Sequence, residues 1–155
     1  MEPEIAKIYG NKVRVRACGI CLDDDQRLLM VNHSSITPTN FWAPPGGGVE
    51  FGESIQDCLA KEFREETGLN ITPSDFLFGC EYIQKPIHSI ELFYIVTVNS
   101  GRLRTGSDPE IQIIKDVRFM SADDLANIPA GELHGVFRLI DSPADLKSLR
   151  GFFRI

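Results

Sequence analysis

The sequence lacks an excess of basic residues. Its 16 Lys and Arg side chains are outnumbered by 22 Asp and Glu, which gives a formal net charge of −6. A protein that binds the nucleic-acid backbone without sequence preference needs a basic face, so this balance disfavours a nucleic-acid partner. It remains compatible with a small phosphorylated ligand held through a bound cation.

The chain also lacks an apolar run of membrane-spanning length, a signal peptide, internal repeats and low-complexity tracts. We therefore expect a cytoplasmic protein with no membrane partner. The length of 155 residues suits one domain with its own core, so residues 1–155 are expected to form a single domain. The oligomeric state is open between a monomer and a homodimer.

Cysteine is scarce, with four residues in the chain: Cys18, Cys21, Cys58 and Cys80. The segment VRVRACGICL alternates apolar residues with Arg14 and Arg16, which is the pattern of a β-strand. Cys18 and Cys21 are three positions apart and would face opposite sides of that strand. No second cysteine pair follows, so we expect small buried core residues in place of a zinc or redox site.

The order of predicted elements indicates an α+β fold. Strands are expected at 13–22, 76–83, 91–98 and 116–120, with 27–31 as the hairpin partner of the first strand. A helix follows the glycine-rich segment near residue 46, and helical segments are expected at 121–126, 132–140 and 144–149. Strands on both sides of a central helix predict a mixed sheet covered by helices.

The central helix has clear ends in the sequence. Ser54 followed by Asp57 resembles a capping box, and Gly68 supplies a left-handed stop. At about 100° per residue, the apolar stripe and the acidic residues share one face of this helix. The stripe consists of Ile55, Cys58, Leu59 and Phe63, and the acidic residues on it or at its margin are Glu62, Glu65 and Glu66. The solvated side is predicted to hold Asp57, Ala60, Arg64 and Thr67.

Three glutamates on a buried face need a partner. Like charges one turn apart repel by about 0.2–0.5 kcal/mol per pair, and burial of unpaired carboxylates costs more. A solvated charge run, with Lys61 and Glu65 as a surface pair, would place the acids opposite Leu59, where they do not lie. Clustered carboxylates suit Mg²⁺ or Mn²⁺, so a metal site is predicted here.

Gly46, Gly47 and Gly48 lead by a short segment to the start of this helix. Glycine allows backbone conformations that other residues avoid and lets a ligand approach closely. A plain turn is the alternative interpretation. Next to a group of carboxylates, we expect a loop on the phosphate side of a site.

The segment from Gly47 to Leu69 resembles the Nudix box, GX5EX7REUXEEXGU, in which U is a bulky apolar residue. Gly47 and Glu53 match its first glycine and glutamate, and the remainder matches in register. The one departure is Lys61, where the family has arginine. The flanking segments FWAPPGGGVEFGES and DPEIQIIKDVRFMSADDL also resemble the family.

The resemblance implies a Nudix fold, with a mixed β-sheet sandwiched between α-helices. It also implies hydrolysis of a nucleoside diphosphate linked to another group, X, with Mg²⁺ or Mn²⁺ and release of a nucleoside monophosphate. Glu62, Glu65 and Glu66 would be the metal ligands, and Glu53 would support the site. The catalytic base is open between Glu66, Glu53 and Glu110.

The departure at Lys61 has an expected consequence. The family's arginine holds a carboxylate in place, and lysine keeps the charge but loses the two-pronged geometry. We therefore expect slower catalysis or a looser carboxylate, with activity retained.

The Nudix box does not contain the residues that would select the group X or the nucleobase of the substrate. The aromatic residues that could stack a base are more often core residues: Phe41, Trp42, Phe93 and Tyr94. His33 and His88 are expected to be structural, and Arg14 and Arg16 are open between phosphate ligands and exposed edge charges. A nucleotide-binding regulator with little turnover and an RNA-end processing enzyme are the alternative functions.

Overall fold

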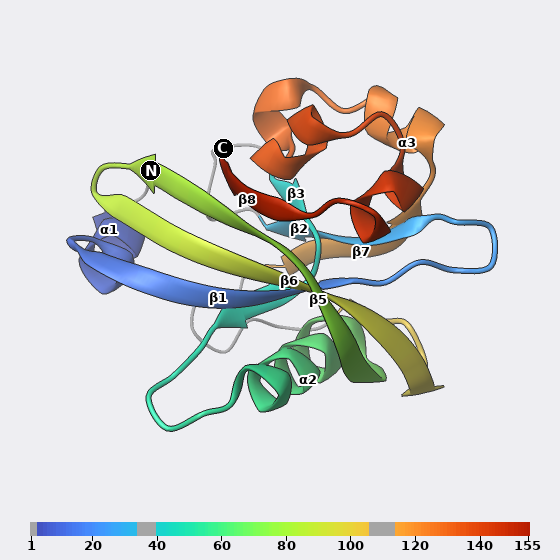
Figure 1. The fold of residues 1–155 in the computed structure, drawn as a ribbon, viewed down its shortest axis with the longest axis horizontal. Coiled ribbons are helices and arrows are strands. Elements are labelled where there is room, and N and C mark those ends of the chain that lie inside the picture. The colour runs from blue at the N-terminus through green and yellow to red at the C-terminus, as the bar shows by residue number, and fades with distance from the viewer. Residues whose placement is uncertain (1–2, 34–39, 106–113) are drawn as a thin grey trace.

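The computed structural model describes residues 3–33, 40–105 and 114–155 (Figure 1). Glu110 lies outside these residues. The α-helices are α1 (Pro3–Tyr9), α2 (Ile55–Thr67) and α3 (Ala122–Ala126), and three 3-10 helices follow at Ala130–Glu132, Gly135–Leu139 and Pro143–Lys147. The strands are β1 (Lys12–Ile20), β2 (Leu28–His33), β3 (Trp42–Ala43), β4 (Gly46–Gly48), β5 (Leu69–Gln84), β6 (Ile87–Gly101), β7 (Ile114–Met120) and β8 (Gly151–Arg154).

The strands form two sheets. In the larger sheet the order is β4-β1-β6-β5-β8, with β1 parallel to β6 and β5 parallel to β8, while the other neighbours are antiparallel. The smaller sheet has the order β3-β2-β7 and is antiparallel. The mixed sheet predicted from the sequence is confirmed, and the fold is α+β.

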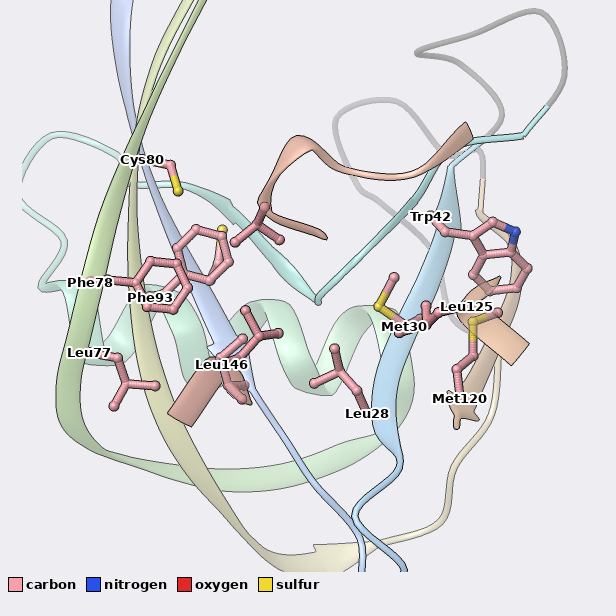
Figure 2. Packing of buried hydrophobic residues seen from close by; sticks show 13 residues of the cluster. Leu28, Met30, Trp42, Leu77, Phe78, Cys80, Phe93, Met120, Leu125 and Leu146 are labelled. Carbon is pink, nitrogen blue, oxygen red and sulfur yellow. The ribbon is translucent and has the colours of Figure 1, made fainter. Parts of the chain in front are cut away.

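Helices cover this β-layer on both sides, as Figure 1 shows, with α2 on one side and the C-terminal helical segments on the other. The two buried clusters explain this arrangement. Along β2, Leu28 and Met30 join the cluster that includes Val136 and Leu146, and Figure 2 shows much of that cluster. The alternate residue Leu29 joins the cluster under α2. The period of two along a strand thus distributes β2 between both cores.

The position of β2 differs from the predicted hairpin. β2 pairs with β3 and β7, and it meets the chain after β1 through the Leu22–Leu28 bridge and a hydrogen bond from Leu29 N to Cys21 O at 2.9 Å. Because all six of its residues are buried, β2 needs a strand on each side to satisfy its backbone. It therefore lies in the middle of the smaller sheet.

The C-terminal segments also differ from the prediction. The segments expected as helices at 132–140 and 144–149 instead hold short 3-10 helices, Gly135–Leu139 and Pro143–Lys147. In the first segment, Gly135 disfavours a longer α-helix. The sequence reasoning missed α1 and the edge strand β8. In the described residues, no helix has both the length and the apolar character needed to cross a membrane.

The cysteine prediction is confirmed. All four cysteines are buried free thiols. Cys18 packs into the cluster on one side of the β-layer and Cys21 into the cluster on the other side. Two thiols on opposite faces cannot share one metal ion.

Candidate functional site: a pair of buried glutamates against a glycine strand

The helix that carries the acidic residues begins and ends where the sequence predicts. Ser54 Oγ accepts a hydrogen bond from Asp57 N at 3.0 Å, which satisfies one of the free donors of the first turn. Gly68 has a φ of 79°, and its N–H donates to Arg64 O at 3.1 Å. Few residues other than glycine adopt this left-handed conformation, so the helix ends at Thr67.

The acidic residues lie on the buried face of α2. Glu66 is 0% exposed and Glu62 is 8% exposed, beside the fully buried Leu59 and Phe63. A run of carboxylates that served only as a solvated surface would not be buried in this way. The structure therefore agrees with the predicted orientation of the helix.

The predicted solvated side of the helix is only partly correct. Asp57 and Arg64 are exposed, but Ala60 is partly buried against a core cluster and Thr67 is fully buried. Its hydroxyl donates to Phe63 O at 2.6 Å and accepts from Leu69 N at 3.2 Å. The chain turns back into β5 at this point, and that turn covers the last residue of the helix.

The three glycines form strand β4 instead of the predicted loop. Gly46, Gly47 and Gly48 pair with β1 opposite Cys18, Ala17 and Arg16. None of the three has a positive φ. Their small size is required because other groups approach closely: a Cβ on Gly46 would lie 2.3 Å from Ala17 O, and one on Gly47 would lie 2.3 Å from Glu62 Cδ.

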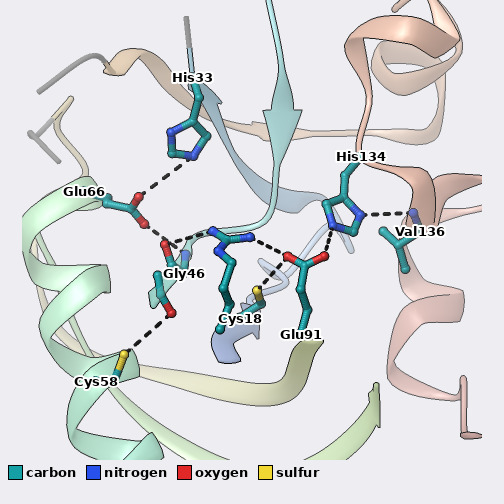
Figure 3. Close-up of polar contacts among 10 residues, drawn as sticks. Cys18, His33, Gly46, Cys58, Glu66, Glu91, His134 and Val136 are labelled. Atoms are coloured by element: carbon teal, nitrogen blue, oxygen red, sulfur yellow. Dashed lines mark hydrogen bonds and ion pairs between the residues drawn. The ribbon is translucent and has the colours of Figure 1, made fainter. Parts of the chain in front are cut away.

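The carboxylates of Glu62 and Glu66 therefore converge on β4. Glu62 rests against Gly47, and Glu66 Oε1 accepts a hydrogen bond from Gly46 N at 2.9 Å. Figure 3 shows the Glu66 side chain reaching from α2 to Gly46. Two buried carboxyl groups thus meet adjacent residues of one short strand.

The residues present suit a hard divalent cation. Glu65 Oε2 is buried and has no hydrogen-bond partner within the described residues. Oxygen donors of this kind are the ligands that Mg²⁺ and Mn²⁺ prefer. However, no three His, Cys, Asp or Glu side chains in residues 3–33, 40–105 and 114–155 are already grouped as a metal site.

Glu53 and Lys61 form a separate ion pair beside this helix face. Lys61 Nζ lies 2.7 Å from Glu53 Oε2, and Glu53 Oε1 accepts from Glu50 N at 3.2 Å. The hydrogen bond from Lys61 lowers the pKa of Glu53. The Lys61 ammonium contacts one oxygen of this carboxylate, whereas the planar guanidinium of an arginine could bind both oxygens.

Sequence reasoning missed a group of charged residues behind β4. Arg16, which the sequence left open between a phosphate ligand and an exposed edge charge, is partly buried between β4 and β6, and its guanidinium pairs with the buried Glu91. Glu91 in turn contacts the buried His134 at 2.7 Å. The alternation in β1 marked Arg16, but no local pattern marked Glu91 or His134.

His33 also lies near the glutamates, although its isolation in the sequence suggested a structural residue. Its Nε2 is 3.9 Å from Glu66 Oε2. Burial, together with the charge of Arg16, lowers the pKa of His33 to about 3, so the imidazole is neutral at pH 7. His88 lies elsewhere, paired with Glu81 at 2.8 Å.

The aromatic residues considered for base stacking are mainly in the core. Phe93 is fully buried and stacks on Phe78 with a centroid separation of 4.6 Å, and Trp42 is 7% exposed. Phe41 and Tyr94 are half-buried. Arg14 lies over the Tyr9 ring at 3.7 Å.

The contact between Gly47 and Glu62 gives a first prediction. In Gly47→Ala, the new methyl group should push the flexible Glu62 carboxylate aside, and we expect turnover to fall by about 10²-fold with little loss of melting temperature. In Gly46→Ala the methyl group meets fixed backbone at Ala17 O, so the melting temperature itself should fall. Turnover and thermal melts of both variants provide the comparison.

Gly131→Ala is the matched control for this pair. A Cβ at Gly131 would have no atom within 4 Å, so its turnover and melting temperature should match those of the unmodified protein. Full turnover in Gly47→Ala would show that the position of Glu62 is not critical.

The chain resembles a known protein family and several characterised proteins. The NUDIX domain model matches residues 12–138. Over 149 residues the chain is 30% identical to the m7GpppN-mRNA hydrolase NUDT17 of Danio rerio, covering 84% of this chain and 49% of that protein. It is 28% identical over 110 residues to an ADP-ribose pyrophosphatase of Methanocaldococcus jannaschii, covering 70% and 60%. The chain thus spans about half to three fifths of the length of these relatives.

Solved structures share the fold. The chain superimposes on a UDP-X diphosphatase with a TM-score of 0.69 at 18% identity, covering 98% of this chain and 74% of that one. It matches a MutT protein from Methanosarcina mazei Go1 with a TM-score of 0.67 at 19% identity, covering 81% and 88%. Identities this low establish a common architecture and no shared substrate.

Proposed function

The chain belongs to the NUDIX family, and from this membership we propose that it is a divalent-cation-dependent pyrophosphohydrolase. Its substrate would be a nucleoside diphosphate linked to another group, X, and one product a nucleoside monophosphate. The observation that carries the proposal is the burial of Glu62 and Glu66 on the helix face that meets β4. Buried carboxylates that converge on one strand suit a site for a cation and a phosphorylated ligand.

We assign Glu62, Glu65 and Glu66 as the residues that would hold Mg²⁺ or Mn²⁺. When bound, such a cation neutralises the diphosphate and helps to generate a nucleophilic hydroxide from water. Gly47 lets the Glu62 carboxylate lie close to β4, and Gly46 N orients Glu66 through its hydrogen bond. These contacts support a role for β4 in holding the ligands.

The catalytic base is assigned among Glu66, Glu53 and Glu110. Lys61 lowers the pKa of Glu53, which makes that carboxylate a weaker proton acceptor and suits an orienting role. We therefore favour Glu66 over Glu53.

We further propose that residues 1–155 form one NUDIX domain. The family model ends at residue 138, yet β8 adds to the larger sheet beside β5. Leu146, also beyond the matched region, is fully buried in the larger core cluster. The last residues of the chain thus pack with the same sheet.

A second candidate function is hydrolysis at a capped RNA end. The names of several relatives favour it, since they include m7GpppN-mRNA hydrolase and the NAD-capped RNA hydrolase NudC of Stutzerimonas stutzeri. A net charge of −6 favours a small nucleotide instead. A regulator with little turnover is a third alternative, which the retained glutamates disfavour.

A substrate panel with Mg²⁺ and with Mn²⁺ tests the proposal. It would contain ADP-ribose, dinucleoside polyphosphates, UDP-sugars, nucleoside triphosphates, NAD and a capped RNA. Release of nucleoside monophosphate from a small nucleotide would support the leading function, and release confined to capped RNA would support the second. Tight binding without release throughout would indicate a regulator.

The Lys61–Glu53 pair gives a second prediction. Lys61→Ala removes the ammonium group that pairs with Glu53. We expect activity to fall by about tenfold or more, the usual effect of losing a supporting contact. Lys61→Arg keeps the charge and adds a second prong, so its kcat should equal or exceed that of the unmodified protein. Inactive Lys61→Arg would mean that the position is built for lysine.

A further inference from the structure

Arg16 connects the candidate metal site to a buried charge network behind it. In the parallel ladder between β1 and β6, Arg16 stands directly opposite Glu91, and its Nη1 pairs with Glu91 Oε2. Its Nη2 lies 3.5 Å from Gly46 O, at the long limit of a hydrogen bond. One guanidinium therefore reaches both Glu91 and β4.

Glu91 is anchored from the other side. His134 Nδ1 accepts a hydrogen bond from Val136 N at 3.0 Å, which leaves Nε2 as the donor to Glu91 Oε1. Burial alone would raise the pKa of Glu91, but the hydrogen bond from His134 and the charge of Arg16 lower it. Arg16 is thus held in place by a carboxylate that remains ionised.

The backbone of Gly46 links this network to α2. Its carbonyl faces Arg16, and its N–H donates to Glu66 Oε1 at 2.9 Å. Figure 3 shows Glu66, Gly46, Glu91 and His134 along one continuous set of polar contacts. Burial alone would lower the pKa of Arg16, but the surrounding groups raise it, with Cys18 and Glu91 contributing more than Glu66 and Glu62.

We propose that Arg16 is a positioning residue of the candidate site. Its fixed positive charge offsets the repulsion between the buried Glu62 and Glu66, and its contact with Gly46 steadies the strand against which both carboxylates lie. This inference rests on the proposed metal site, because it explains how that site stays folded before a cation binds. A guanidinium suits the task since it keeps its charge when buried and has donors for two acceptors at once.

A double-mutant cycle in EDTA tests the proposal. Arg16→Met, Glu66→Gln and the double variant are compared with the unmodified protein by thermal melts. We expect Arg16→Met to lower the melting temperature of the unmodified protein. In the Glu66→Gln background the same substitution should have an effect at least about 2 °C smaller, because less negative charge then has to be offset. A second cycle combines Arg16→Met with Glu91→Gln and serves as the positive control, since Arg16 and Glu91 are in direct contact.

Arg16→Lys separates charge from shape and covers the case in which Arg16→Met fails to fold. The decrease in melting temperature of Arg16→Lys should be less than half of the decrease seen in Arg16→Met. If Arg16→Met does not fold, Arg16→Lys should still fold. The inference is overturned if Arg16 and Glu66 effects add within about 1 °C while the Glu91 cycle shows coupling. It is equally overturned if Arg16→Lys melts as low as Arg16→Met.

The same proteins in Mg²⁺ keep this inference distinct from the proposed function. Mg²⁺ binding to the folded state should raise the melting temperature of the unmodified protein by mass action. It should raise that of Arg16→Met by more, because a nearby positive charge no longer opposes the cation. If Mg²⁺ shifts neither protein, the metal assignment fails, and the cycle in EDTA still decides the role of Arg16.

Discussion

Replacing Glu66 with Gln should lower kcat by about 10²-fold or more while leaving the protein folded. The side chain is fully buried, and its Oε1 accepts a hydrogen bond from Gly46 N. The carbonyl of Gln can accept the same hydrogen bond, so the variant removes the charge and keeps the shape. Steady-state kinetics on the substrate identified in the panel, with a thermal melt, measure both effects.

Asp57→Asn is the matched control for Glu66→Gln. Asp57 lies on the same helix and loses the same charge, but it is exposed and is not one of the buried residues of α2. We expect its kcat to stay within about twofold of the unmodified enzyme. Comparable losses in the two variants would show that the buried face of α2 is not the face that acts on the substrate.

Exhaustive chelation should abolish turnover. In the proposed site, Glu62, Glu65 and Glu66 would supply oxygen ligands and no group that could replace a cation in neutralising a diphosphate. Activity in EDTA should therefore fall below detection and return on addition of Mg²⁺ or Mn²⁺ in excess of the chelator. The measurement is release of nucleoside monophosphate with each metal added back separately.

Ca²⁺ provides the control for this experiment. It binds oxygen ligands at longer distances and with looser geometry than Mg²⁺, so Ca²⁺ should raise the melting temperature without restoring full turnover. Full activity after complete chelation would contradict the metal assignment, whichever residues are responsible for catalysis.

Local features were predictable because neighbouring residues determine them. Ser54 and Gly68 determine the ends of α2, and the helical period places Glu62 and Glu66 beside Leu59. The spacing from Gly47 to Leu69 was enough to recognise the family, which the match over residues 12–138 confirms. The alternation in β1 correctly placed Cys18 and Cys21 on opposite faces.

Other features depended on which strands become neighbours. The glycine segment looked like a loop because nothing near it in the sequence reveals that β1 pairs with it or that Glu62 closes against Gly47. In the same way, local patterns could not place β2 in a second sheet. Strand pairing follows from the burial of whole faces, and a short sequence window does not contain that information.

The sequence by itself thus determined the helix, its acidic face and the family, since each depends on residues within a few turns of one another. Only the tertiary structure decided what lies against that face. Arg16 and Glu91 are separated by 75 positions, and Glu91 and His134 by 43. Their charges meet because β1 and β6 are aligned in register and the C-terminal segment folds over them. The physical reason is that burial makes such charges costly unless each finds its partner, and the fold brings these partners together from distant parts of the chain.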